Sequence, residues 1–190
     1  MKTLALDIGG VCLTLDFPGC WRYFGLDPER PTPPAWKKLY TDYSIGAIGT
    51  WAFIDGIRRV TNGAFTVEQI KAGWNSMLGT EIPETTRFLE KLRNAGWRIV
   101  FFSDTQPLHI ERLRDILSYS RTIPVGIYSC DAGAQKPEAG MYEAFEAAFG
   151  KPDLYLDDRQ CNIDGGLARG WNAVQFIPGV CDRLLADGLL

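Results

Sequence analysis

The stretch LALDIGGVCLTLD, residues 4–16, decides the fold. A short apolar run, typical of a buried strand, ends at a single carboxylate, Asp7, and the glycines Gly9 and Gly10 follow almost at once. In parallel α/β sheets, ligands bind beyond the carboxyl ends of the strands. We therefore expect Asp7 to stand at a ligand site, where glycines let the backbone approach a ligand closely. The simpler interpretation is that the two glycines only form a tight turn.

Four more apolar runs follow this first one and also predict strands. Together the five expected strands are 3–8, 98–103, 124–129, 153–158 and 172–176. Near-continuous apolar runs of this length are typical of strands that are covered on both faces. Helical patterns separate most of them, which predicts a parallel sheet with right-handed crossovers. The fold class is thus α/β, with a Rossmann-like, five-stranded parallel core.

The segments between the later strands have helical spacing. They are residues 83–96, 105–117 and 136–150, and Thr105 is the expected N-cap of the second. Residues 17–80 break the alternation, because they hold aromatic residues and helical patterns (50–60 and 66–78) but no convincing strand. We expect a core of residues 1–16 and 81–190 with a helical insertion of residues 17–80 after the first strand.

The composition excludes several classes of protein. Apolar residues make up 46% of the chain, charged residues 23%, and the net charge is −3, so neither nucleic acid nor an anionic membrane is an expected partner. The five cysteines never form a CxxC pair, which argues against a disulfide framework or a zinc site. No apolar run has the length of a membrane span or of a signal peptide. We expect a cytoplasmic protein, monomeric or homodimeric.

Polar residues gather where the expected strands end. Ser103 closes the second strand, Asp157 and Asp158 close the fourth, and Lys136 precedes the helix after the third. Together with Asp7 they bring three negative charges close to one positive charge. Two like charges about 4 Å apart repel by roughly 4 kcal/mol at an effective dielectric near 20. Lys136 offsets one negative charge, and a divalent cation would neutralise the remainder. Oxygen ligands and phosphate chemistry favour Mg²⁺.

A cation beside a buried carboxylate permits covalent phosphoryl transfer. The carboxylate of Asp7 attacks phosphorus, and water then hydrolyses the aspartyl phosphate. The carbonyl of Gly9 is placed to reach the metal, and the amides of residues 8 and 9 to reach phosphate oxygens. The sequence therefore favours a phosphoryl-transfer site at this edge of the sheet.

Four motifs resemble those of the haloacid dehalogenase-like (HAD) hydrolase superfamily. They are, in the family's order, LALDIGGV, IVFFSDT, QKPEAGMYEAF and LYLDDRQCN. Each is weak alone, but the ordered set covers nearly the whole chain. The resemblance implies that Asp7 is the nucleophile and a metal ligand, that Ser103 binds a phosphoryl oxygen, and that Lys136 holds the nucleophile and the phosphoryl group together.

The resemblance also implies roles for the remaining site residues. Asp158 becomes the direct metal ligand with Asp157 as a helper, and the Gly9 carbonyl is a further ligand. Gly10 and Asp104 lie in the phosphate-binding segments, and Asn162 orients the loop of the acids.

The insertion is similar to the helical caps that select substrates in this superfamily. The chain most resembles small bacterial sugar phosphatases, especially α-D-glucose-1-phosphate phosphatases, which implies a small phosphorylated metabolite as substrate. Four cap aromatics are candidates for stacking on a sugar, although helical spacing is more often a sign of core residues. They are Trp21, Tyr43, Trp51 and Trp74.

The chain departs from the superfamily pattern at two positions. Gly9 stands where most of its phosphatases carry an acid/base aspartate, and Asp104 stands where asparagine is common. Positioned proton donors are typically worth about 10² to 10⁴ in rate. An inactive relative that binds a phosphorylated ligand or partner is therefore one alternative. The others are a metal-independent haloacid dehalogenase, disfavoured by the acid pair at 157 and 158, and a receiver domain, disfavoured by the motif order.

Overall fold

Five parallel strands form the centre of the protein, which the computed structural model describes over residues 1–190. The order across the sheet is β5–β4–β1–β6–β7, so β1 lies in the middle, next to strands that come much later in the chain. The strands are β1 (Thr3–Leu6), β4 (Arg98–Ser103), β5 (Gly126–Tyr128), β6 (Leu154–Asp157) and β7 (Ala173–Gln175). The predicted five-stranded parallel sheet is confirmed, with each strand placed inside or at the bounds expected.

Both faces of the sheet are buried, which explains the unbroken apolar runs. On β1, Leu4 and Leu6 belong to one apolar cluster and Ala5 to another on the opposite face. β4 and β6 alternate in the same way. At about 25 cal/mol per Å² of apolar surface removed from water, this burial on two sides is the main force holding the sheet.

Helices cover each face of the sheet. One face is covered by α5 (Pro83–Asn94), α6 (Pro107–Ile116) and α10 (Val180–Ala186). The other is covered by α7 (Ser129–Ala132), α8 (Ala139–Phe149) and α9 (Gln160–Ala168). Proline occupies the first position of α5 and α6, where its missing N–H costs no helical hydrogen bond. A short 3₁₀ helix, η1 (Ser120–Thr122), connects α6 to β5.

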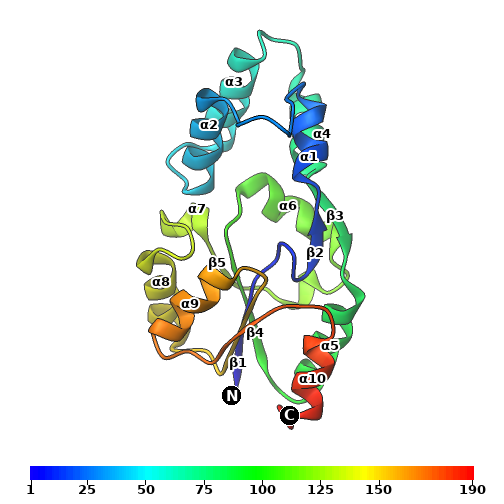
Figure 1. Ribbon diagram of the computed structural model, residues 1–190, viewed down its shortest axis with the longest axis vertical. Helices are drawn as coiled ribbons and strands as arrows, with labels where there is room; N and C mark the ends of the chain where they lie inside the picture. The colour runs from blue at the N-terminus through cyan, green and yellow to red at the C-terminus, as the bar shows by residue number, and fades with distance from the viewer.

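Four further helices form a separate layer above the carboxyl ends of the strands (Figure 1). They are α1 (Phe17–Tyr23), α2 (Pro34–Ser44), α3 (Thr50–Val60) and α4 (Val67–Asn75). The layer, called the cap below, has its own apolar cluster, in which Tyr43 stacks on Phe53 and Phe53 packs edge-on against Trp74. Thr66 starts α4 with a capping box that it shares with Gln69.

Two short antiparallel strands connect the cap to the sheet. They are β2 (Leu13–Leu15) and β3 (Leu78–Glu81), paired through Leu13 with Glu81 and Leu15 with Leu78. The expectation that residues 17–80 contain no strand is wrong at residues 78–80. The reason is that β3, with the sequence LGTE, is only half buried and has no alternation of apolar and polar residues.

Two other local expectations need correction. Thr105 is not the cap of α6, because the helix begins at Pro107 with Gln106 as its N-cap, and the Thr105 N–H donates to Ser129 Oγ. The helices α1 and α2 were not predicted individually, only as part of the helical insertion. No helix combines the length and apolarity needed to cross a membrane, and the longest, α5, has 12 residues.

Candidate active site

The site residues predicted from the strand ends do meet in space. A cavity of about 260 Å³ lies between the carboxyl edge of the sheet and the cap, and its walls include Asp7, Ser103, Lys136 and Asp158. These residues follow or end β1, β4 and β6, or precede α8. Because the parallel strands all end at this edge, residues up to 151 positions apart in sequence, Asp7 and Asp158, come to one point.

Lys136 is the electrostatic centre of the site. Its Nζ donates to Asp7 Oδ1 at 2.9 Å, to Asp157 Oδ2 at 2.6 Å and to the Phe102 carbonyl at 2.8 Å. All three ammonium donors are thus used, while only 1% of the side chain is exposed. Burial opposes the charged amine, but the negative charges of Asp7 and Asp157 outweigh it and raise the pKa of Lys136 above its ordinary value.

Asp157 is fully buried and saturated with hydrogen bonds. Besides Lys136, its Oδ2 accepts from the Tyr155 hydroxyl at 2.7 Å, and its Oδ1 accepts from Asn162 Nδ2 and the Arg159 N–H, both at 2.9 Å. Burial works against ionisation, yet the Lys136 charge and these bonds lower the pKa of Asp157 below its ordinary value. A carboxylate with all its acceptor positions filled positions its neighbours, which fits the helper role predicted for it. The bond from Asn162 fits the predicted orienting role.

Asp7 and Asp158 keep carboxylate oxygens free. Only Oδ1 of Asp7 accepts a hydrogen bond, and neither side-chain oxygen of Asp158 accepts any. One ligand atom from each of Asp7, Asp157 and Asp158 lies within 4.8 Å of the other two. Burial and the charge of Asp157 raise the pKa of Asp158, and burial raises the pKa of Asp7 to about 7 despite the attraction of Lys136. With one lysine among three carboxylates, the cluster fits a hard divalent cation.

The two glycines after Asp7 differ in what they do. The amides of Ile8 and Gly9 donate to no other backbone or side-chain group, so they are free for a ligand as predicted for residues 8 and 9. The expectation that Gly10 binds phosphate is wrong, because its N–H donates to the Leu13 carbonyl at 2.8 Å. Gly10 instead has a left-handed backbone (φ +73°), and a Cβ there would lie 2.4 Å from Asp158 Oδ2. Its missing side chain makes room for that carboxylate.

Asp104 has a structural contact that the sequence did not reveal. Its Oδ1 accepts the backbone N–H of Lys136 at 2.9 Å, which holds the loop carrying the lysine against the end of β4. Burial raises the pKa of Asp104, and the Lys136 charge opposes this rise. Asp104 also lines the cavity beside Ser103, whose buried hydroxyl makes no hydrogen bond within the protein. Ser103 is therefore available to a ligand.

The cap contributes residues that were not predicted. Phe17 and Tyr40 line the cavity from the cap side, whereas none of the four candidate aromatics does. Tyr43 and Trp74 are wholly buried in the cap cluster, Trp21 packs against Trp36 within it, and Trp51 lies on the outer surface beside Lys71. Trp21, Tyr43 and Trp74 are therefore core residues of the cap, as their helical spacing indicated, and Trp51 is not. No spacing signal marks Tyr40, because its place depends on how the cap sits on the sheet.

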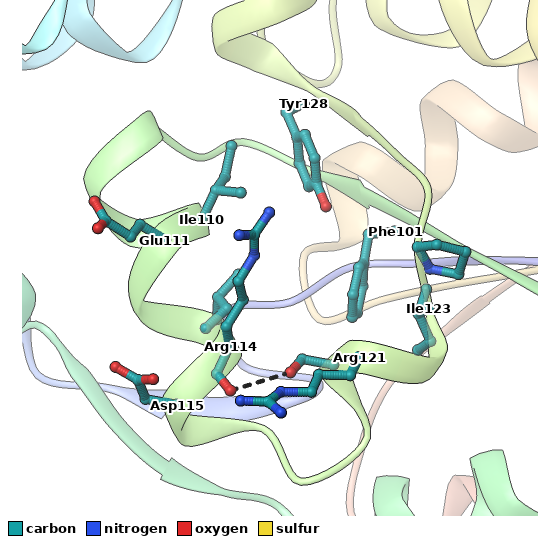
Figure 2. A pocket seen from close by; sticks show the side chains of 11 residues that line it. Phe101, Ile110, Glu111, Arg114, Asp115, Arg121, Ile123 and Tyr128 are labelled. Atoms are coloured by element: carbon teal, nitrogen blue, oxygen red, sulfur yellow. Dashed lines mark hydrogen bonds between the residues drawn. The ribbon is translucent and has the colours of Figure 1, made fainter.

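Two further lining residues, Gln135 and Arg159, come from the core. Gln135 directly precedes Lys136 and Arg159 directly follows Asp158 in the sequence. This adjacency to predicted site residues is the signal that could have identified them. A separate and larger cavity of about 760 Å³ lies between α6, η1 and β5 and shares no lining residue with the site (Figure 2). Arg114 and Arg121 border it, and it contains no carboxylate cluster of the kind described above.

No family model matches the chain. Among solved structures, a HAD family enzyme, BT-2542 from Bacteroides thetaiotaomicron, superposes with a TM-score of 0.83 over 94% of this chain and 95% of that one, at 23% identity. The protein has the HAD fold. The resemblance drawn from the four motifs is thereby confirmed at the level of the fold.

Other structures with the HAD fold agree. A predicted HAD-like family hydrolase from Porphyromonas gingivalis superposes with a TM-score of 0.80 at 22% identity, covering 97% of this chain and 98% of that one. L-2-haloacid dehalogenase from Xanthobacter autotrophicus is more distant, with a TM-score of 0.61 at 15% identity over 99% of this chain and 83% of that one. BT-2542 has also been crystallised with magnesium and inorganic phosphate, in a structure with a TM-score of 0.79.

Proposed function

We propose that the protein is a Mg²⁺-dependent phosphomonoester hydrolase that works through an aspartyl phosphate on Asp7. Its substrate is a small sugar phosphate or a similar metabolite. One observation carries the proposal: Asp7 and Asp158 keep free carboxylate oxygens at the carboxyl edge of a HAD-fold sheet, while Lys136 and Asp157 beside them are fully hydrogen-bonded. The cap that covers this edge supplies the second wall of the cavity.

The residues fit a magnesium ion. Asp7, Asp158 and the Gly9 carbonyl would hold it, and the space left by Gly10 lets the Asp158 carboxylate approach. When bound, the ion neutralises negative charge on the transferring phosphoryl group and on the carboxylates. The magnesium and phosphate complex of the related enzyme from Bacteroides thetaiotaomicron supports this assignment.

The first step is attack by Asp7. Its Oδ2, which accepts no hydrogen bond, forms a bond to phosphorus, and the bond between phosphorus and the leaving oxygen breaks. Lys136 keeps the other oxygen, Oδ1, in place through its 2.9 Å bond, so the carboxylate cannot rotate away. The Ser103 hydroxyl and the free amides of Ile8 and Gly9 stabilise negative charge on the phosphoryl oxygens.

The second step regenerates the enzyme. Water attacks phosphorus, the bond from Asp7 Oδ2 to phosphorus breaks, and inorganic phosphate leaves with the water oxygen and both of its protons, one of which moves to another phosphate oxygen. Asp7 returns to its carboxylate form, which Lys136 again holds.

The leaving oxygen has no acid/base aspartate at position 9. A Cβ on Gly9 would lie 2.7 Å from Leu15 Cδ1, so Leu15 of β2 occupies the space that such a side chain would need. A leaving group that requires little protonation suits this arrangement. The anomeric oxygen of a sugar is more acidic than an ordinary alcohol, which agrees with the resemblance to sugar-1-phosphate phosphatases.

The proposal is tested by phosphate release from sugar phosphates with and without Mg²⁺. We expect turnover that requires Mg²⁺ and falls by at least about 10³-fold in Asp7→Asn, because the nucleophile is lost. Asp187→Asn, at an exposed position near the C-terminus, serves as the matched control and should retain activity.

Two other outcomes of this assay point to other functions. Binding of sugar phosphates without turnover would identify an inactive relative, an alternative that the glycine at position 9 favours. Chloride release from 2-chloropropionate without added metal would identify a dehalogenase, the activity of the related enzyme from Xanthobacter autotrophicus. The free carboxylate of Asp158 has no use in a metal-independent reaction and argues against that outcome.

A further inference from the structure

Arg159 stands at the mouth of the active-site cavity, directly after Asp158. Its backbone N–H donates to Asp157 Oδ1 at 2.9 Å, which fixes the point from which the side chain extends. The residue is exposed and lines the cavity, yet its guanidinium forms no ion pair and no hydrogen bond within the protein. An arginine is charged at every physiological pH and offers five donors. The mouth therefore carries an unused, permanent cation.

No other cation of the cavity is free. Lys136 donates its three N–H groups to Asp7, Asp157 and the Phe102 carbonyl. The remaining charged groups of the lining are the carboxylates of Asp7, Asp104 and Asp158. An anion that enters beside the phosphoryl group thus meets one available positive side chain, Arg159.

The rest of the mouth is suited to a compact carbon skeleton. Leu15 and Phe17 form an apolar wall, Tyr40 adds an aromatic ring with a hydroxyl, and Gln135 adds an amide. The cavity, at about 260 Å³, is smaller than the roughly 300–1,000 Å³ of sites for drug-sized ligands. A phosphorylated molecule no larger than a sugar phosphate suits such a space.

We propose that Arg159 binds a second oxyanion, a carboxylate or a phosphate, on the leaving-group side of the substrate. The preferred substrate is then a small phosphorylated acid or a bisphosphate rather than a monophosphate whose leaving group carries no charge. This inference rests on the proposed phosphatase function and specifies its substrate class. The guanidinium pairs with either oxyanion through two parallel N–H···O bonds, which an ammonium group does not match.

Matched pairs of substrates test the assignment. Glucitol 6-phosphate against 6-phosphogluconate isolates a carboxylate on an open chain, and glucose 1-phosphate against glucose 1,6-bisphosphate isolates a second phosphate on a ring. The second member of each pair carries the additional charge and is called the anionic member. We expect kcat/KM at least about tenfold higher for the anionic member of one pair, the size of one charge-assisted hydrogen bond. The pair that shows the larger preference identifies which oxyanion is bound.

Variants then assign the preference to the residue. Arg159→Gln should abolish this preference, because KM should rise far more for the anionic member than for the other member while kcat changes little. Arg159→Lys should restore part of the preference. Arg114→Gln removes the same charge at the other cavity (Figure 2) and should change nothing. The inference is overturned if the wild type shows no preference, or if Arg159→Gln weakens both members equally, since the guanidinium would then act on the transferred phosphoryl group.

If none of the four compounds is hydrolysed, the proposed phosphatase function is contradicted, but the role of Arg159 is not yet decided. In that case calorimetry with Mg²⁺ on Asp7→Asn still decides the role of Arg159. Tighter binding of the anionic member, lost when Arg159→Gln is added, supports the assignment, and equal binding of both members refutes it.

Discussion

The sheet edge and the cap form opposite walls of one cavity but are built on different physical principles. At the sheet edge, buried charges are held by short hydrogen bonds: Lys136 makes three, and Asp157 accepts four. The cap is instead an aromatic cluster, in which Tyr43, Phe53 and Trp74 pack on one another. Charge placement thus holds the carboxylates and the lysine of the candidate site, whereas apolar packing holds the wall that faces them.

The two walls are joined by only a few contacts. Gln106 Nε2 donates to Ser44 Oγ at 2.8 Å, Ser129 Oγ donates to the Ser44 carbonyl at 2.6 Å, and the Leu108 N–H donates to the Tyr43 hydroxyl at 3.2 Å. In addition, His109 Nε2 lies 3.1 Å from the Trp74 carbonyl, and the His109 ring stacks on the Trp74 ring. The two short strands β2 and β3 provide the only covalent connection. A change at the sheet edge should therefore damage turnover and stability together, and a change at these contacts should alter the cap and its junction with α6 but not the sheet.

The largest effect is expected from Lys136→Met. Removing the ammonium leaves Asp7 and Asp157 buried without their cation, and breaking a buried ion pair in this way costs about 3–5 kcal/mol. We expect a loss of this size in the free energy of unfolding, measured by urea denaturation, together with loss of turnover. Lys136→Met combined with Asp157→Asn should recover part of the stability, because one uncompensated charge is removed. If the single variant were as stable as the wild type, the charged sheet edge would not be a stabilising element.

Mg²⁺ should stabilise the folded protein in a way that depends on pH. Burial raises the pKa of Asp7 to about 7, above its ordinary value of 3.8, so the folded state holds a proton that the unfolded state has lost. Without metal, the free energy of unfolding should therefore decrease as pH rises from about 4 to 7, because over this range the unfolded state loses the Asp7 proton more readily than the folded state does. A cation that binds the ionised carboxylate reverses this loss, so the rise in Tm with Mg²⁺ should be larger at pH 8 than at pH 5.

The size of the Mg²⁺ effect follows from mass action. At 100 times its Kd, a ligand adds about 2.7 kcal/mol to the folded state. Asp158→Asn should remove most of the rise in Tm, while Asp187→Asn should keep it. A rise of equal size at both pH values would indicate that the ion binds away from Asp7.

The sheet edge was largely predictable from the sequence, because its elements follow local rules. Apolar runs buried on two faces mark strands, and polar residues at their carboxyl ends mark the site, so Asp7, Ser103, Lys136 and the acid pair were all placed together. Gly10 was assigned wrongly because the sequence does not show which amide is already bonded to the Leu13 carbonyl. The bond from Asp104 to the Lys136 backbone likewise depends on two loops meeting in space.

The cap was predictable only as a helical insertion. Its aromatic residues share similar helical spacing, so the sequence cannot distinguish Tyr40, which faces the cavity, from Tyr43, which lies three residues later inside the cap cluster. The strands β2 and β3 escaped prediction because they are short and, apart from the buried Leu13, exposed or only partly buried, and because they pair with each other across more than 60 residues of sequence. Nonlocal pairing and the placement of one layer on another are properties that no local pattern encodes.

The smallest effect is expected from Tyr43→Phe, which tests the cap side of the comparison. The aromatic stacking on Phe53 remains, but the N–H of Leu108, buried in the first turn of α6, loses its acceptor. An unsatisfied buried donor costs about 1–3 kcal/mol. The control is Tyr23→Phe, at an exposed cap position whose hydroxyl makes no hydrogen bond.

In Tyr43→Phe, amide hydrogen exchange should rise in α2 and at the start of α6 while β1 and β6 stay protected. KM should increase with little change in kcat, because Tyr43 does not line the cavity. If kcat fell as far as in Lys136→Met, or if exchange rose across the sheet as well, the two walls would be one cooperative unit. The proposed division between a charged edge that carries out the reaction and an apolar cap that selects the substrate would then be wrong.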